Sequence, residues 1–234
     1  MQVVILAGGL GTRLRSVAPD TPKAIVPVAG RPFVDHQLAL LQMNGLTDVL
    51  LCIGHFGEKI VAHVGDGSQF GMNVSYVQED PKSLLGTGGA LVNALANIEP
   101  EFVVMYGDSY LPVDFRDFVA KSRAQNRPAV MSVFRNGGLW DSSNTRVEGD
   151  RVTFYSKKSK PGECDFIDYG LTYFRREVIE SYRSLPPPLD MAKIQGDLVA
   201  RGEMGAWEAP VRFYEIGKPE GLAELDEFLR GRKS

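Results

Sequence analysis

Cysteine and histidine are scarce in this sequence, with two cysteines and three histidines among 234 residues. Cys52 and Cys164 are far apart, and no run of metal-binding residues accompanies them. A disulfide framework and a zinc site are therefore both unsupported. We expect reduced, structural thiols. No carboxylate pattern accompanies His36, His55 or His63, so we expect structural histidines as well.

Long hydrophobic runs and excess positive charge are also missing. No segment approaches the roughly 18 apolar residues that cross a membrane, and residues 3–7 lack the basic flank of a secretory signal. The net charge of −3 argues against a general nucleic-acid surface, which needs a concentrated basic patch. We expect a cytoplasmic protein without membrane or nucleic-acid partners.

In the first half, apolar runs typical of buried strands alternate with segments typical of helices. Parallel strands joined by helices are the usual solution for such a pattern. The sequence therefore predicts an α/β fold, a Rossmann-like mixed and mostly parallel sheet flanked by helices. The expected strands are residues 3–7, 48–54, 73–78 and 101–106, and the expected helices are 33–43, 57–64 and 90–96, the last after a glycine turn at 86–89.

The second half is expected to extend the same sheet, because it contains further strand-like runs without a linker or a repeat before them. A single domain over residues 1–234 fits this length. The expected strands are 128–135, 151–155 and 166–174, the last of them antiparallel, and the expected helices are 190–200 and 221–229.

A glycine-rich loop, residues 8–14 (GGLGTRL), directly follows the first strand. Glycines allow the backbone to approach an anion and to point its N–H groups at phosphate oxygens. The spacing is not G-x-G-x-x-G, and no lysine-threonine pair follows as in a P-loop. The loop alone predicts phosphate binding. Arg13 within it and Lys23 beyond it make the prediction more specific.

With Pro22-Lys23 and the segment at 27–32 (PVAGRP), the loop resembles the signature of the sugar-phosphate nucleotidyltransferase family. That signature reads G-G-x-G-T-R-L, then P-K and P-x-x-G-x-P. Further landmarks follow in the family's order at 85–90 (LGTGGA), 106–108 (YGD) and 214–220 (YEIGKPE). The resemblance implies an enzyme of nucleotide-sugar biosynthesis. Such a transferase moves a nucleotidyl group from a nucleoside triphosphate to a sugar 1-phosphate with Mg²⁺.

The resemblance also implies three catalytic residues. Arg13 would hold the leaving pyrophosphate, since its guanidinium can bind two phosphate oxygens. Lys23 would stabilise charge at the reacting phosphate. Asp108 follows an apolar strand, where open α/β sheets place their ligands, and would bind magnesium. Most relatives have an aspartate as the second metal ligand, whereas this sequence has Glu215, which offers the same oxygens one methylene further out.

Nucleotide binding in the family involves the backbone after the first strand, a polar residue after the third strand, and the Gly-Thr-Gly-Gly turn. The polar residue here is Gln78, which can donate and accept, so uracil, thymine and guanine all fit it. Gln78 could equally cap the strand end. The expected nucleotide-binding residues are Leu6, Ala7, Gly8, Gly9, Gly11, Thr12, Gln78, Gly86 and Thr87.

The sugar-phosphate side is expected in the second half, residues 111–234, with nucleotide binding in residues 1–110. Relatives often have a lysine facing the sugar phosphate shortly before a glycine beside the sugar ring. Lys158 fits the first role, with Lys157 as the alternative, and Gly170 fits the second. Asp168 could accept hydrogen bonds from sugar hydroxyls. A lysine run is also typical of a solvated surface.

The compact chain is most similar to heptose 1-phosphate guanylyltransferases and muramate 1-phosphate uridylyltransferases. GTP and D-glycero-D-manno-heptose 1-phosphate are the favoured substrates. Uridylyl, thymidylyl or cytidylyl transfer, a non-catalytic nucleotide-sugar sensor and a homo-oligomer stay open. An oxidoreductase would need an acidic residue about 20 residues beyond the glycines. Lys23 and prolines stand there instead, although Asp35 lies not far beyond.

Overall fold

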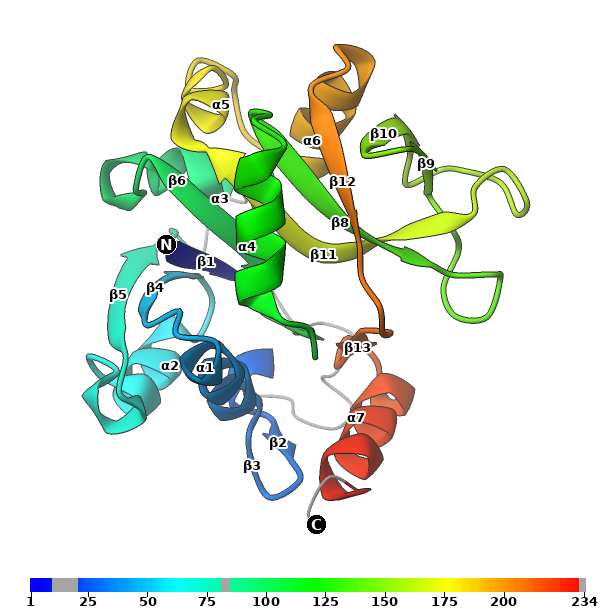
Figure 1. Ribbon diagram of the computed structural model, residues 1–234. Helices are drawn as coiled ribbons and strands as arrows, with labels where there is room; N and C mark the ends of the chain where they lie inside the picture. Colours follow the sequence, from blue (N-terminus) through cyan, green and yellow to red (C-terminus); the bar gives the residue numbers. More distant parts are fainter. Residues whose placement is uncertain (10–20, 81–84, 232–234) are drawn as a thin grey trace.

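A single mixed sheet runs through the protein, with helices on both of its faces (Figure 1). The structure is a computed structural model that describes residues 1–9, 21–80 and 85–231. Nine strands of this described part form the sheet. In their order across the sheet they are β5 (Asn73–Gln78), β4 (Asp48–Ile53), β1 (Gln2–Ala7), β6 (Glu101–Tyr106), β11 (Phe166–Arg175), β8 (Ala129–Arg135), β12 (Met204–Glu208), β10 (Arg151–Tyr155) and β9 (Thr145–Glu148).

The first four strands in this order are parallel, and they lie where the sequence predicts them. Helices α1 (Phe33–Met43) and α2 (Gly57–Val64) also have the predicted bounds. The expected glycine turn at 86–89 is wrong, because helix α3 (Gly86–Asn93) already begins there. Its early N–H groups at Gly88 and Gly89 both donate to Leu189 O, so a distant segment stabilises the start of this helix.

The second half continues the sheet, as predicted. β11 pairs antiparallel with β6 and with β8, whereas β8 pairs parallel with β12. The fold class, a mixed sheet flanked by helices, is therefore confirmed. Strands β9 and β12 and helix α4 (Phe115–Ala124) were not predicted from the sequence. The signal for α4 was present, because Asp114 caps it by accepting from the backbone N–H groups of Arg116 and Asp117.

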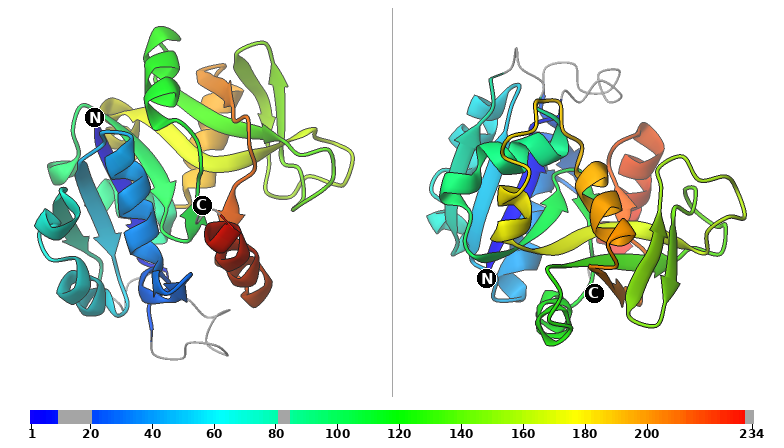
Figure 2. Two further views of the ribbon diagram at one scale, coloured as in Figure 1. Left: turned by 60° about the horizontal axis from the view of Figure 1, so that its bottom comes forward. Right: turned by 90° about the horizontal axis from the view of Figure 1, so that it is seen from above.

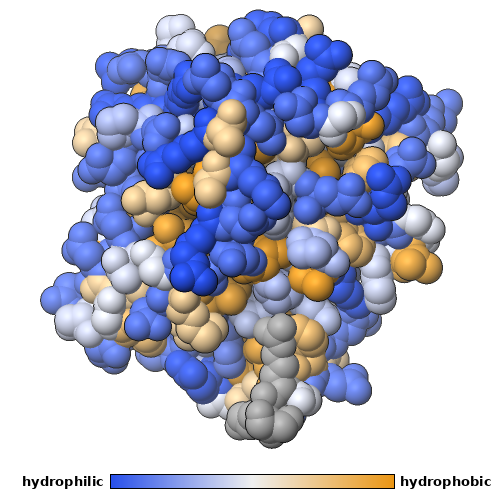
Figure 3. Space-filling model, in the orientation of Figure 1, coloured by the Kyte–Doolittle hydropathy of each residue, from blue (hydrophilic) through white to orange (hydrophobic). Residues whose placement is uncertain are grey.

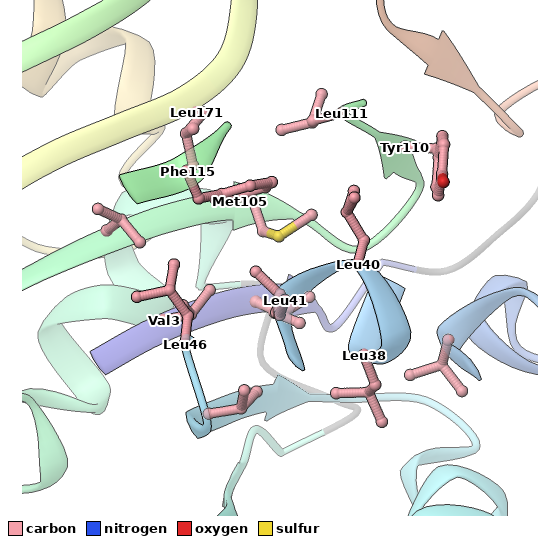
Figure 4. Packing of buried hydrophobic residues seen from close by; sticks show 14 of the residues in the cluster. Val3, Leu38, Leu40, Leu41, Leu46, Met105, Tyr110, Leu111, Phe115 and Leu171 are labelled. Atoms are coloured by element: carbon pink, nitrogen blue, oxygen red, sulfur yellow. The ribbon is translucent and has the colours of Figure 1, made fainter. Parts of the chain in front are cut away.

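Helices cover both faces of the sheet (Figure 2), and two hydrophobic cores lie on these opposite faces. The first packs α1, α2, α4 and α7 (Pro219–Gly231) against one face, and Figure 4 shows Leu41 of α1 beside Met105 of the sheet. The second packs α3, α5 (Arg176–Glu180) and α6 (Met191–Ala200) against the other face. These strands are buried on both faces of the sheet, which explains why their sequences are almost continuously apolar.

The shorter elements lie beside the sheet. They are the 3₁₀ helices η2 (Lys23–Ile25), η3 (Ser68–Phe70) and η4 (Leu95–Asn97), and the two-stranded pairs β2 (Pro27–Val28) with β3 (Arg31–Pro32) and β7 (Ser109–Tyr110) with β13 (Tyr214–Glu215). The face seen in Figure 3 is largely hydrophilic with separate hydrophobic patches. In the described ranges, every helix is too short or too polar to cross a membrane.

Both cysteines are buried and unbonded to each other, as expected of structural thiols. Cys52 lies near the carboxyl end of β4, one strand in from the edge of the sheet, where burial raises the pKa of its thiol to about 12. A thiol with such a pKa stays protonated near neutral pH and is a poor nucleophile.

Glycines at the carboxyl ends of three neighbouring strands let their backbones touch. Gly8 follows β1, Gly54 follows β4 and Gly107 follows β6. A Cβ atom at Gly54 would lie 2.6 Å from Gly8 O, and one at Gly107 would lie 2.8 Å from Leu6 O and 2.9 Å from Ala7 Cα. Side chains are therefore excluded here, and the edge of the sheet forms a floor made of backbone.

We predict that Gly107→Ala destabilises the protein by about 1–3 kcal/mol, the usual cost of an extra methyl group in a tightly packed place. Its methyl would collide with the backbone of β1, which cannot move without disturbing the sheet. Gly196→Ala is the matched control, because a Cβ atom there in α6 meets nothing within 4 Å. It should stabilise the helix by about 0.5–1 kcal/mol. Urea unfolding measures both, and equal effects would contradict the prediction.

Candidate active site

A cavity of about 460 Å³ opens at the carboxyl ends of β1 and β6. This is the edge of a parallel sheet where ligands usually bind. Eight residues expected from the sequence line it together, namely Leu6, Ala7, Gly8, Gly9, Lys23, Gly86, Thr87 and Asp108. Gly11, Thr12 and Arg13 lie outside the described residues. Residues far apart in the chain are thus brought to one place by the order of the strands.

An ion pair between Lys23 and Asp108 lines this cavity. Lys23 Nζ is 2.7 Å from Asp108 Oδ2, and the two side chains are 18% and 29% exposed. The backbone of Gly217 borders the pair, because a Cβ atom there would lie within 4 Å of both charged atoms. Each group neutralises the other, yet both line the cavity and can reach a ligand. The pair offers a donor for phosphate and a hard oxygen for a cation.

The turn that carries Asp108 is fixed through its backbone. Gly107 N donates to Leu6 O at 3.0 Å, and Ile216 N donates to Asp108 O at 2.9 Å. Beyond the turn, β7 pairs with β13, and this places Glu215 opposite Ser109. Glu215 is therefore near Asp108 along the paired strands, but it lines a neighbouring cavity of about 450 Å³ instead.

The donor set is compatible with magnesium bound mainly through substrate phosphates. No group of three or more histidine, cysteine, aspartate or glutamate side chains that could hold a metal occurs among residues 1–9, 21–80 and 85–231. Magnesium commonly uses one or two carboxylates together with phosphate oxygens and waters. Asp108 supplies a suitable oxygen inside the cavity, and Glu215 lies one residue from it across the β7–β13 pair.

Glu79 faces the cavity, and the expected base-contacting residue Gln78 does not line it. Gln78 donates from its amide to Gly54 O and to Glu79 O, each at 3.0 Å, which caps the end of β5. Glu79 is half-buried, and a Cβ atom on Gly8 would lie 2.6 Å from its Oε1. Desolvation raises the pKa of Glu79. The sequence reading missed this residue, although it is adjacent to the one chosen.

The start of α3 is held by a segment more than a hundred residues away. Gly88 N and Gly89 N donate to Leu189 O, and Leu189 N donates to Leu85 O. Gly86 has a φ of +74°, and a Cβ atom there would lie 2.5 Å from Leu189 O. Glycine is therefore required at this position for backbone packing as well as for any approach of a ligand.

On the other side of the cavity, Lys157 links the second half to the start of α3. Its Nζ lies 2.8 Å from Asp190 Oδ2, and Thr87 Oγ1 donates to Asp190 Oδ1 at 3.1 Å. Lys158, the first choice from the sequence, is exposed one residue further on. The structure thus joins the alternative, Lys157, through Asp190 to Thr87, a residue that lines the cavity.

Asp168 lies at an irregularity in β11, where the pairing with β8 shifts register. Its carboxylate accepts from Gly170 N at 3.0 Å, with Tyr155 Oη and Gln195 Nε2 each at 3.4 Å. Desolvation raises the pKa of Asp168. Gly170 has a φ of +91°, which favours glycine, so the backbone here takes a path that most residues resist.

Tyr106 is a further residue of this cavity that was not predicted from the sequence. It lines the cavity, and its ring would lie 3.3 Å from a Cβ atom on Gly170. Burial raises the pKa of Tyr106, and the nearby Asp168 carboxylate raises it further. Its hydroxyl therefore stays protonated and can donate a hydrogen bond.

Two of the histidines form polar contacts outside this cavity. His63 Nε2 lies 2.7 Å from Asp35 Oδ1, so the expectation that no carboxylate accompanies the histidines is wrong for this one. The two residues join α2 to α1, a contact between helices that the sequence does not show. His36 Nε2 lies 2.8 Å from Val28 O. Both contacts support the structural roles expected for these two side chains.

One family model and several curated proteins match this chain. The family model described as nucleotidyl transferase matches residues 2–201. A mannose-1-phosphate guanylyltransferase of Mycobacterium tuberculosis is 30% identical over 77% of this chain and 50% of its own. A D-glycero-alpha-D-manno-heptose 1-phosphate guanylyltransferase of Aneurinibacillus thermoaerophilus is 36% identical over 50% of each. The chain spans about half the length of these curated relatives.

A solved structure is similar over almost the whole chain. HddC from Yersinia pseudotuberculosis, crystallised in complex with GMP-PN, superposes with a TM-score of 0.79 at 27% identity. The match covers 97% of this chain and 99% of that one. The arrangement of strands and helices described above is therefore shared along the entire length of that protein.

We predict that Glu79→Gln stabilises the ligand-free protein at pH 7–8. The pKa of Glu79 is raised in the folded state, so ionisation costs folding stability once the pH exceeds the unfolded pKa of about 4.3. The neutral amide removes that cost, and the difference from the wild type should vanish below about pH 4. Thermal unfolding from pH 4 to 8 measures it. Glu58→Gln, at an exposed position on α2, is the control, and an equal gain there would contradict the prediction.

Proposed function

The chain belongs to the nucleotidyl transferase family, and on this premise we propose that it transfers a nucleotidyl group from a nucleoside triphosphate to a sugar 1-phosphate. The observation that carries the proposal is the Lys23–Asp108 pair in a glycine-floored cavity. A phosphate-binding cation and a metal-binding carboxylate are thus adjacent. This is the pairing that the transfer of a charged phosphoryl group requires.

In the proposed reaction, an oxygen of the sugar phosphate attacks the α-phosphorus of the triphosphate. A new P–O bond forms, the bond from the α-phosphorus to the bridging oxygen breaks, and pyrophosphate leaves with the electron pair. The attacking phosphate is already ionised, so the chain needs no general base. Its work is to hold two mutually repelling anions in line. Lys23 would donate to a phosphate oxygen, and Arg13 would hold the pyrophosphate.

We assign the magnesium site to Asp108, with Glu215 as the second carboxylate, directly or through a water. When bound, Mg²⁺ supplies screening of the phosphate charges and polarises a phosphoryl oxygen. Support comes from the position of Asp108 in the cavity and of Glu215 on the strand paired next to it. The Lys23 ammonium can move from the Asp108 carboxylate to a bound phosphate, because Lys23 and Asp108 line the same cavity.

Glu79 supports GTP as the nucleotide. An ionised carboxylate only accepts hydrogen bonds, and guanine presents two neighbouring donors, N1–H and N2–H, on one edge. Uracil and thymine present a single N–H between two carbonyl oxygens, which a carboxylate would repel. HddC was crystallised with the guanine nucleotide analogue GMP-PN, and it has the same fold. Guanine therefore complements this cavity better than uracil or thymine does.

For the acceptor we propose D-glycero-D-manno-heptose 1-phosphate, bound by the half of the chain at 111–234. Lys157 or Lys158 would receive its phosphate, and the contact of Lys157 with Asp190 beside Thr87 supports the former. Asp168 would accept hydrogen bonds from sugar hydroxyls, and Gly170 leaves room for the ring. Two similar heptose 1-phosphate guanylyltransferases, 35% and 36% identical over about half the chain, support this sugar.

The direct test is pyrophosphate release across GTP, UTP, dTTP and CTP with a panel of sugar 1-phosphates, each with and without Mg²⁺. We expect release with GTP and the heptose phosphate, and none without the metal. Nucleotide binding without turnover for any pair would instead indicate a nucleotide-sugar sensor. Reduction of a nicotinamide cofactor by the protein would indicate an oxidoreductase.

We predict that Lys23→Ala lowers kcat by about a hundredfold or more, as removal of one transition-state donor does elsewhere. The control is Lys121→Ala, because Lys121 is an exposed lysine of α4 in an ion pair with Asp117. It should retain normal turnover. Near-normal turnover of Lys23→Ala with the preferred substrates would remove this lysine from the mechanism.

We predict that Glu79→Gln lowers kcat/KM for GTP by about 10- to 100-fold, because a hydrogen bond to a charged group contributes about 1.5–3 kcal/mol. Activity with UTP should fall less or rise, since an amide can donate to a uracil carbonyl. Gln78→Ala is the comparison, because Gln78 faces Gly54. A change of base preference in Gln78→Ala but not in Glu79→Gln would reverse the assignment.

A further inference from the structure

Gln37 is a buried amide of α1 whose nitrogen contacts the turn that carries Asp108. Its side chain is 1% exposed, and Nε2 donates to Tyr106 O at 3.1 Å and to Ser109 O at 2.8 Å. Both partners are carbonyl oxygens, so the atom that faces them must be the donor nitrogen. One side chain therefore uses both of its N–H groups on a single turn.

The two carbonyl groups stand on either side of the Gly107–Asp108 dipeptide. Tyr106 is the last residue of β6, and Ser109 is the first residue of β7. A bridge between them fixes the span of the turn, and with it the direction in which Asp108 leaves the backbone. The same bridge sets the position of β7, and β7 in turn pairs with the strand that carries Glu215.

The amide at this position has a cost as well as a gain in folding stability. Gln37 Oε1 is buried and has no hydrogen-bond partner among the described residues. A buried acceptor without a partner costs free energy, and an apolar side chain in α1 would avoid that cost. It would also leave the two carbonyl groups of the turn without their donor. The amide is thus suited to holding the turn and poorly suited to simple core packing.

We propose that Gln37 is a positioning residue for the metal site, acting through the backbone of the Tyr106–Ser109 turn on Asp108. The inference rests on the proposed function, in which Asp108 binds Mg²⁺. Residues that orient a metal ligand without touching the metal typically change metal affinity 10- to 100-fold when they are replaced. An effect of this kind is separable from a general loss of stability.

The test compares Gln37→Met with Asn44→Leu in the full chain. Met keeps the length of the side chain and the helix propensity but has no N–H group. Asn44 ends the same helix and is 8% exposed, and its amide bridges Leu40 O and Phe115 N, away from Asp108. Both changes remove a buried amide. Binding of Mn²⁺, as a paramagnetic substitute for Mg²⁺, is titrated with a non-hydrolysable GTP analogue present, and thermal unfolding is followed in parallel.

We expect about tenfold weaker Mn²⁺ binding for Gln37→Met, with binding of the metal-free nucleotide unchanged, and unaltered Mn²⁺ binding for Asn44→Leu. Gln37→Glu keeps the shape with at most one donor hydrogen and provides a milder variant should the methionine protein not fold. It too should weaken Mn²⁺ binding. Normal binding in the folded Gln37 variants, or equal weakening in Asn44→Leu, would overturn the positioning role alone. A wild type that binds no Mn²⁺ would overturn the metal site and both proposals.

Discussion

The close approach of β1, β4 and β6 at their carboxyl ends is the constraint on which the site depends. Gly54 touches Gly8 and Gly107 touches Ala7, with no space for a Cβ atom at either contact. Such contact excludes side chains from the floor of the cavity, so a ligand meets backbone there. The charged residues must then stand on the segments that leave this edge. Asp108 and Lys23 do so from opposite ends of the chain's first half.

The distribution of charge within the cavity gives a ligand a direction. Lys23 is paired with Asp108, and the Glu79 carboxylate stands by Gly8. A triphosphate with its phosphates beside Glu79 would bring like charges together in a partly desolvated place, which is costly. Phosphates at Lys23 and an uncharged base at Glu79 avoid that repulsion.

The sequence predicts those parts of the structure that depend on local patterns. The first four strands and helices α1 and α2 follow from hydrophobic periodicity, which parallel strands and their helices show clearly. The choice between Gln78 and Glu79 depends on where one strand ends, and a shift of one residue exchanges the sides of the sheet. Contacts such as Lys157 with Asp190 join segments 33 residues apart, and no local pattern encodes them.

The last segment of the described chain completes the site, although it lies beyond residues 2–201, which match the family model. Ile216 N binds Asp108 O, and Gly217 borders the Lys23–Asp108 pair. Farther on, Asp226 of α7 accepts from Ala29 N at 2.6 Å, in the hairpin that follows Lys23. The segment therefore holds both sides of the ion pair, one through the turn and one through the hairpin. Loss of α7 packing would loosen Lys23 and Asp108 together, so the geometry of the ion pair depends on the folding of this helix.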